Sequence, residues 1–69
     1  MQTIYKIPAP YSIGHLIEVY GDPDMARYEW RILDAQGRPI KDSCDHARGM
    51  QYGFAEIALR DALNYATID

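Results

Sequence analysis

The sequence predicts an α+β fold in which a three-stranded antiparallel sheet, a meander, packs against one C-terminal amphipathic helix. From Arg27 to Ile32 charged and apolar side chains alternate, as in a strand with one face on a core and one in water. From 54 to 66 small and apolar residues recur instead at helical spacing. Because one hairpin leads into one helix, the helix must lie across the hairpin to bury its apolar stripe.

Residues 1–12 form an N-terminal extended segment. Thr3–Ile7 is rich in strand-forming residues and could extend the sheet as a short edge strand. Pro8 and Pro10 then exclude a helix and favour an extended path.

Residues 13–20 fit two structures. Apolar residues fall at helical spacing behind Ser12, a candidate N-cap, so a helix is one alternative. Gly14 disfavours that helix, and the following residues are strand formers, so we predict a strand from His15 to Tyr20. The segment Gly21–Asp24 then supplies the glycine, proline and aspartates of a turn.

The next hairpin is the clearest element of the 15–43 meander. One face of its first strand carries the apolar residues Tyr28, Trp30 and Ile32. The other face carries the charged residues Arg27, Glu29 and Arg31. Asp34–Gly37 reads as the hairpin loop, with Gly37 in the left-handed conformation. A third strand follows over Arg38–Ser43. Pro39 has no amide hydrogen to donate to a neighbouring strand, so this strand either begins at Pro39 or lies at an edge of the sheet. Residues 44–52 should form a loop or a single helical turn.

The 54–66 helix has a buried stripe of small and large apolar residues, namely Ala55, Ala58, Leu59, Ala62, Leu63 and Ala66. Its alanines allow a close approach to the sheet. Glu56 and Arg60 are four residues apart and should pair on the solvent side. Ile57 falls off the stripe and should meet the N-terminal segment, a second copy of the chain, or a partner.

Length and charge limit the functions that the chain can perform. The 69 residues predict a single compact domain over 1–69, which buries only about 60% of its unfolded surface. Ten acids and seven bases give a net charge of −3, and the five arginines are scattered. Since phosphate binding requires a basic surface, direct nucleic-acid binding is disfavoured, and a protein partner is the better hypothesis.

The chain is expected to be a soluble, cytoplasmic protein. Cys44 is the only cysteine, so no internal disulfide can form, which fits a reducing compartment. No apolar run approaches the roughly 18 residues that span a bilayer, and the N-terminus lacks the pattern of a signal peptide.

One loop brings candidate metal ligands together. Cys44, Asp45 and His46 are consecutive, and His15 could supply a fourth ligand. Structural zinc sites usually show two pairs of Cys or His, which this sequence lacks, so a polar loop with a half-buried thiol is favoured over a metal site. No Ser-His-Asp set and no glycine-rich phosphate loop can be assembled from the sequence. We therefore predict no enzymatic activity and no cofactor.

The acids and tyrosines are the candidate binding residues. The turn aspartates could simply cap backbone amides, or they could form a negative surface that competes with phosphate for a basic groove. Trp30 and Tyr28 are expected in the core, with Phe54 closing one end. Five tyrosines then have less room in the core: Tyr5, Tyr11, Tyr20, Tyr52 and Tyr65. They could form a protein-recognition face, or they could be ordinary exposed tyrosines, which are common on protein surfaces. The predicted partner-binding residues are Asp22, Asp24, Asp42, Asp45, Tyr20, Tyr52 and Tyr65.

In format the chain resembles the anti-CRISPR proteins, small acidic inhibitors made by phages and mobile elements. The features that carry the resemblance are the length, the meander closed by one helix, the acidic turn Gly21–Asp24 and the abundant tyrosine. It implies binding to a Cas effector subunit in a bacterial host cytosol and occlusion of target-DNA recruitment. It supplies no diagnostic motif and no binding residue.

A local stretch is similar to small bacterial ββα domains, which often occur in tandem. The stretch runs from Trp30 to Ser43, with an aromatic residue, Asp34 and Gly37 at the matching positions. This match bears on the fold more than on the function. A hypothesis from another class is a structural or assembly module that dimerises, or docks, by an edge strand, because exposed edges readily recruit another chain. The oligomeric state expected is a monomer or a weak homodimer.

Overall fold

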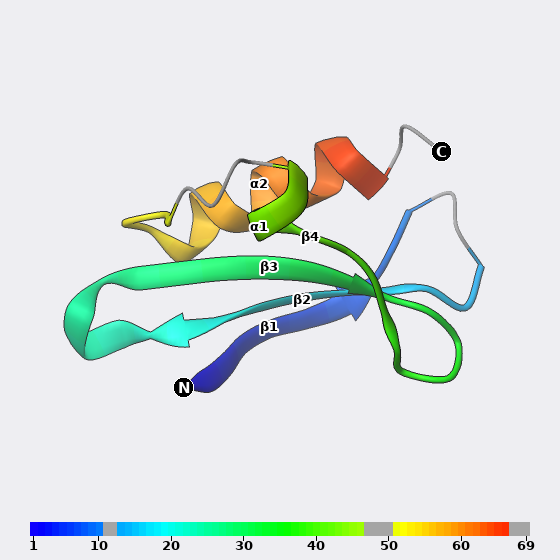
Figure 1. Ribbon diagram of the computed structural model, residues 1–69, viewed down its shortest axis with the longest axis horizontal. Coiled ribbons are helices and arrows are strands. Elements are labelled where there is room, and N and C mark those ends of the chain that lie inside the picture. The colour runs from blue at the N-terminus through cyan, green and yellow to red at the C-terminus, as the bar shows by residue number, and fades with distance from the viewer. Residues whose placement is uncertain (11–12, 47–50, 67–69) are drawn as a thin grey trace.

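The computed structural model describes residues 1–10, 13–46 and 51–66, with the side chains of residues 45 and 46 outside that description. An antiparallel sheet in the order β1-β2-β3-β4 carries the helix α2 on one face (Figure 1). In chain order the elements are β1 (Gln2–Pro8), β2 (Leu16–Asp22), the 3-10 helix η1 (Pro23–Met25), β3 (Arg27–Leu33), β4 (Pro39–Asp42), α1 (Ser43–His46) and α2 (Ala55–Ala66). The α+β class and the C-terminal helix are confirmed.

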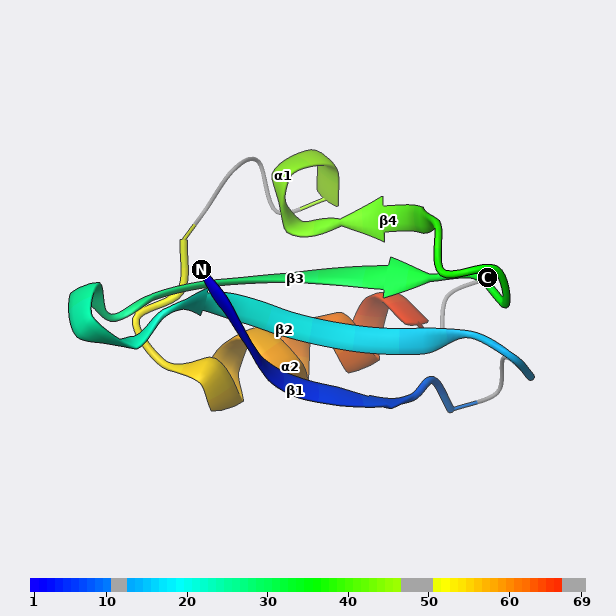
Figure 2. The same cartoon turned by 90° about the horizontal axis from the view of Figure 1, so that it is seen from below.

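The sheet has four strands, not three, because the N-terminal segment that could extend it does so as β1. Residues 16–22 form a strand, so the alternative of a helix over 13–20 is wrong. Its side chains explain the choice: Ile17 and Val19 are fully buried, and Glu18 between them lies on the opposite face. Figure 2 shows the strands side by side, with α2 behind them.

The two predicted turns have identifiable local causes. Asp22 caps η1 by accepting a hydrogen bond from the amide of Asp24 at 3.1 Å. In the β3–β4 hairpin Asp34 accepts from the amides of Gln36 and Arg38, both at 2.9 Å, and Gly37 has the positive φ of +82° that was predicted for it. The strand β4 ends at Asp42 because the chain turns into α1 at Ser43.

The core lies between β2, β3 and α2. Val19 pairs with Trp30, and Ile17 with Ile32, so the two strands present one apolar surface. The alanines Ala58 and Ala62 are fully buried against it. Small side chains let the helix backbone come close to the sheet, and Trp30 fills the remaining space with no exposed surface. The prediction that Trp30 packs under the helix is confirmed.

Polar groups complete the edge of β3 where β4 does not reach. The backbone of Tyr28 exchanges two hydrogen bonds with that of Tyr52, at 2.9 and 3.0 Å. The amide of Trp30 donates to Oγ of Ser43 at 3.3 Å, and Ser43 is fully buried. A buried amide without a partner would cost about 1–3 kcal/mol, so these contacts satisfy backbone groups of β3 that β4 does not pair.

Two sequence expectations need correction around α2. Phe54 is 69% exposed and does not close the core, because α2 begins only at Ala55 and the side chain lies before its buried stripe. Glu56 accepts a hydrogen bond from the Tyr5 hydroxyl at 3.0 Å, and Nε of Arg60 lies 3.8 Å from Asp61. The expected Glu56–Arg60 pair is thus replaced by other contacts.

The remaining open question about α2 concerned Ile57. Its side chain is partly buried and packs against the core cluster. It therefore contributes to the protein's own core.

The close approach of β2 and β3 at Gly21 yields a stability prediction. A Cβ built on Gly21 would lie 2.1 Å from the carbonyl oxygen of Arg27 and 2.8 Å from Cα of Tyr28. Because both are backbone atoms, no side-chain movement can relieve the collision. Gly21→Ala should lower the free energy of unfolding by about 3 kcal/mol or more, enough to unfold much of a protein of this size.

Urea denaturation followed by circular dichroism measures this effect. Gly53→Ala is the matched control, since a Cβ at Gly53 meets nothing within 4 Å. The control should change the stability by less than about 1 kcal/mol. Equal stabilities for the two variants would contradict the observed register of β2 and β3.

Candidate protein-binding surface

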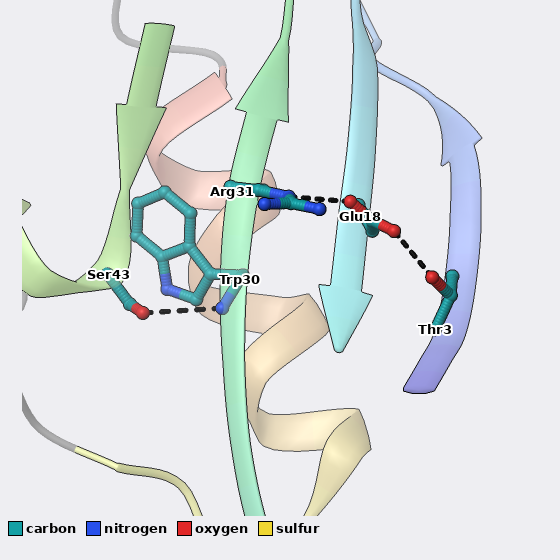
Figure 3. Close-up of polar contacts among 5 residues, drawn as sticks. All are labelled: Thr3, Glu18, Trp30, Arg31 and Ser43. Atoms are coloured by element: carbon teal, nitrogen blue, oxygen red, sulfur yellow. Dashed lines mark hydrogen bonds and ion pairs between the residues drawn. The ribbon is translucent and has the colours of Figure 1, made fainter. Parts of the chain in front are cut away.

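The sheet face opposite α2, which we call the open face, is built around one carboxylate. Glu18 on β2 lies between Arg31 on β3 and Lys6 on β1 in the strand register. Oε2 of Glu18 accepts from the Thr3 hydroxyl at 2.5 Å, and Oε1 accepts from Nε of Arg31 at 2.6 Å (Figure 3). Although no described helix or strand covers this face, Glu18 is only 5% exposed.

The environment of Glu18 keeps it ionised. Burial alone would raise its pKa, but the hydrogen bonds from Thr3 and Arg31 and the Arg31 and Lys6 charges outweigh burial and lower it. A general acid or base near neutral pH needs a raised carboxyl pKa instead. The Thr3–Glu18–Arg31 contacts therefore link β1, β2 and β3, and their chemistry is that of a structural ion pair.

The predicted acidic residues fall in two places. Asp22 and Asp24 lie together at the connection between β2 and β3, where Asp22 serves as a cap and Asp24 is exposed. Asp42 on β4 pairs with Arg31 on β3, whereas Asp22 on β2 pairs with Arg27 on β3. Arg31 and Arg27 are four residues apart along β3. That separation is about 13 Å along a strand. The side chain of Asp45 lies outside the described residues.

Two of the three predicted binding tyrosines take part in the core. Tyr52 is only 5% exposed, and its hydroxyl oxygen accepts from Nε1 of Trp30 at 3.3 Å. The ring of Tyr65 stacks on Trp30 with centroids 5.2 Å apart. The expectation that Tyr52 is exposed is wrong, because the sequence gives no sign that its backbone bridges to Tyr28.

The other tyrosines keep part of their surface. Tyr20 is half-buried on the open face, with the guanidinium carbon of Arg31 4.7 Å from its ring centroid. Tyr5 is also half-buried and reaches Glu56 on α2. Tyr11 lies outside the described residues. Of the three tyrosines predicted to bind a partner, Tyr52 and Tyr65 contact Trp30, and Tyr20 lies instead on the open face.

A shallow hollow at the β2–β3 end of the sheet was not predicted. This hollow, which we call the methionine depression, has a volume of about 260 Å³ and is lined by Met1, Gly21, Asp22, Met25, Arg27, Glu29 and Gln51. Met1 and Met25 are 92% and 56% exposed. Its residues are far apart in sequence, and the pairing of Gln2 with Gly21, seen only in the fold, brings Met1 to the others.

Of the four candidate metal ligands, the structure describes the side chains of Cys44 and His15. Cys44 is exposed, and its Sγ donates to Oε1 of Glu29 at 3.2 Å. The Nδ1 atom of His15 is buried without a hydrogen-bond partner in the structure as described. Within residues 1–10, 13–46 and 51–66, no three Cys, His, Asp or Glu residues are grouped as metal ligands. The side chain of His46 lies outside the description.

Comparison of the chain with models of protein families, with curated proteins and with solved structures found no match. Among the described residues no helix has both the length and the apolar character needed to cross a membrane.

The lowered pKa of Glu18 predicts a pH-dependent contribution to stability. Ionised Glu18 stabilises the fold above its ordinary pKa of 4.5, and this contribution is lost as the pH falls through the lower pKa of the folded state. At neutral pH Glu18→Gln should lower the free energy of unfolding by about 1 kcal/mol, since water screens the partly exposed Arg31. The difference should shrink as the pH falls below 4.5.

Urea unfolding of both proteins at neutral and acid pH measures that difference. Asp24→Asn removes one negative charge from an exposed turn and serves as the control. It should change the stability by less than about 0.5 kcal/mol. A Glu18→Gln effect that grows at acid pH would contradict the assignment.

Proposed function

We propose that the chain is a non-enzymatic protein-binding inhibitor directed at a nucleic-acid-handling complex, with the anti-CRISPR proteins as its specific class. The observation that supports the proposal is the β2–β3 end of the sheet. There Asp22 and the exposed Met25 line the methionine depression, and Asp24, which lies between them in the chain, is exposed. Charged and apolar groups that a partner can contact together are typical of protein-recognition surfaces.

The proposed mechanism is occlusion of a basic groove. A surface that binds DNA or RNA carries lysine and arginine, and their attraction to negative charge acts over several ångströms. The net charge of −3 and the projecting turn acids would draw this chain to such a groove. Once bound, it would exclude the phosphate backbone from the same residues. Asp42 and Tyr20, on the open face, would extend the contact.

The polar contacts in the structure support binding over proton transfer. Glu18, the most buried acid, is ionised and held by Thr3 and Arg31. Asp34 accepts two amide hydrogen bonds that fold its own loop. These carboxylates stabilise the backbone, as Asp22 also does by capping η1, whereas Asp24 is exposed at the hairpin end.

Assembly through an edge strand is the alternative function, and the strand edges disfavour it. In β1 the register shifts between Thr3 and Tyr5, Lys6 is exposed, and the strand ends at Pro8. The other edge strand, β4, has four residues and starts at Pro39. A bulge, a lysine, prolines and a short length are features by which natural sheets prevent edge pairing. Of the two expected oligomeric states, a monomer and a weak homodimer, these features favour the monomer.

A direct test measures DNA binding by guide-loaded Cas effector complexes in a mobility-shift assay with the full chain added. An effector that the chain inhibits should lose DNA binding as the concentration of the chain rises. The variant with both Asp22→Asn and Asp24→Asn should inhibit about tenfold less, because two attractive charges are removed. Asparagine keeps the capping acceptor, so the fold is retained.

The control variant places the same charge change elsewhere. Ala35→Lys with Gln36→Lys also raises the net charge from −3 to −1, but at the exposed β3–β4 turn. It should inhibit like the wild type. If both variants lose the same inhibitory potency, net charge and not the position of the acids explains the inhibition. If the chain inhibits none of the effectors tested, the anti-CRISPR assignment is contradicted.

A further inference from the structure

The open face carries a row of charged residues whose signs alternate from strand to strand. In the strand register Lys6 on β1 lies next to Glu18 on β2, Glu18 next to Arg31 on β3, and Arg31 next to Asp42 on β4. The row therefore reads base, acid, base, acid across the whole sheet. Lys6 is exposed, and Arg31 and Asp42 keep part of their surface, while α2 lies on the other face (Figure 1). Another molecule can reach this row.

A second row on the open face is apolar. Pro8 lies next to Leu16, Leu16 next to Leu33, and Leu33 next to Pro39. On β1, β2 and β3 these residues are two positions from the charged row, and residues two apart share a face of the sheet. Both prolines are exposed and Leu16 is half-buried, so covering this row would remove apolar surface from water.

The order of the signs makes the charged row complementary to a copy of itself. A two-fold axis that runs parallel to the strands, midway between β2 and β3, reverses the strand order in the second copy. Lys6 then faces Asp42 of the second copy, and Glu18 faces Arg31 of the second copy. An axis that runs across the strands would instead set each of these residues against its own equivalent, and like charges repel. In the first arrangement the apolar row also faces itself.

We propose that the open face binds a second copy of the chain, face to face and with the strands of the two sheets aligned, as a weak homodimer. A second copy matches every charge in the row, whereas a segment of one sign, nucleic acid included, would meet as many like charges as opposite ones. Sheets that stack in this way keep their strand directions within about 30° of each other. Glu18 and Arg31 already pair within each chain, so the further gain is small.

The edge features that favour the monomer do not oppose this contact. A bulge in β1, prolines and the short β4 prevent pairing between strand edges, and a face-to-face contact uses no free edge. The dimer goes beyond the proposed function, and it would cover Tyr20 and Asp42 and compete with a partner that contacts them. An effector inhibited by a strictly monomeric chain would leave the inhibitor function standing and overturn the dimer. A dimer without an inhibited effector would do the reverse.

Sedimentation equilibrium of the full chain measures the dimer. The apparent mass should rise from one chain towards two as the concentration is raised to about 1 mM, the range of weak complexes. Lys6→Glu and Asp42→Lys each set like charges against one another in a homodimer, so each variant alone should dimerise about tenfold more weakly. In an equal mixture the introduced glutamate faces the introduced lysine, and the unaltered Asp42 and Lys6 face each other. The mixture should dimerise as strongly as the wild type.

The matched controls make the same charge changes on the other side of the sheet. Arg60→Glu and Glu56→Lys alter exposed residues of α2, and each should dimerise like the wild type, alone and mixed. Emission from the buried Trp30 verifies that each variant is folded. A chain that stays monomeric up to about 1 mM would overturn the proposal. So would a mixture that dimerises no better than its separate variants, or α2 variants that weaken the dimer equally.

The ¹⁵N spectrum of the wild-type chain locates the contact without any substitution, and it decides the matter if a variant does not fold. As the protein concentration is raised, the amide signals of Lys6, Glu18, Arg31 and Asp42 should shift, and those of α2 should not. Shifts centred on Met25 would place the contact at the methionine depression and would contradict the open-face dimer.

Discussion

The structure depends on the enclosure of Trp30 between the sheet and α2. The indole is fully buried, pairs across the sheet with Val19, stacks on Tyr65 and donates to Tyr52. A chain of 69 residues has room for one core, and this residue joins β2, α2 and the segment at Tyr52 within it. The alanines of α2, the bridge at residue 52 and the buried Ser43 are all arranged to let the helix and the edge of β3 close around the indole.

Closing the core in this way determines which residues remain for function. Tyr52 and Tyr65 are used to cover the tryptophan, and Glu18 is used to join three strands on the open face. The β2–β3 end has a different character, because Asp24 and Met25 are exposed there while the strands beneath approach closely at Gly21. The proposed function places binding at this end of the sheet.

The fold was largely predictable, because alternation over β3 and helical spacing over α2 each reflect burial of one face. The uncertain segment 13–20 was decided by pairing on both sides, information that no local pattern contains. Of the proposed binding surface, only the turn acids were predictable. Tyr52 was misassigned because its burial arises from a bridge to Tyr28, and the methionine depression was missed because register alone brings Met1 to Met25.

Acrylamide quenching of the intrinsic fluorescence tests the central claim most directly, because Trp30 is the only tryptophan. An indole with no exposed surface should emit at short wavelength and should be quenched far less in the folded protein than in urea. Fluorescence quenched as efficiently in the folded state as in the unfolded state would show that α2 does not cover Trp30, and would contradict the enclosure on which the core and its remaining surface depend.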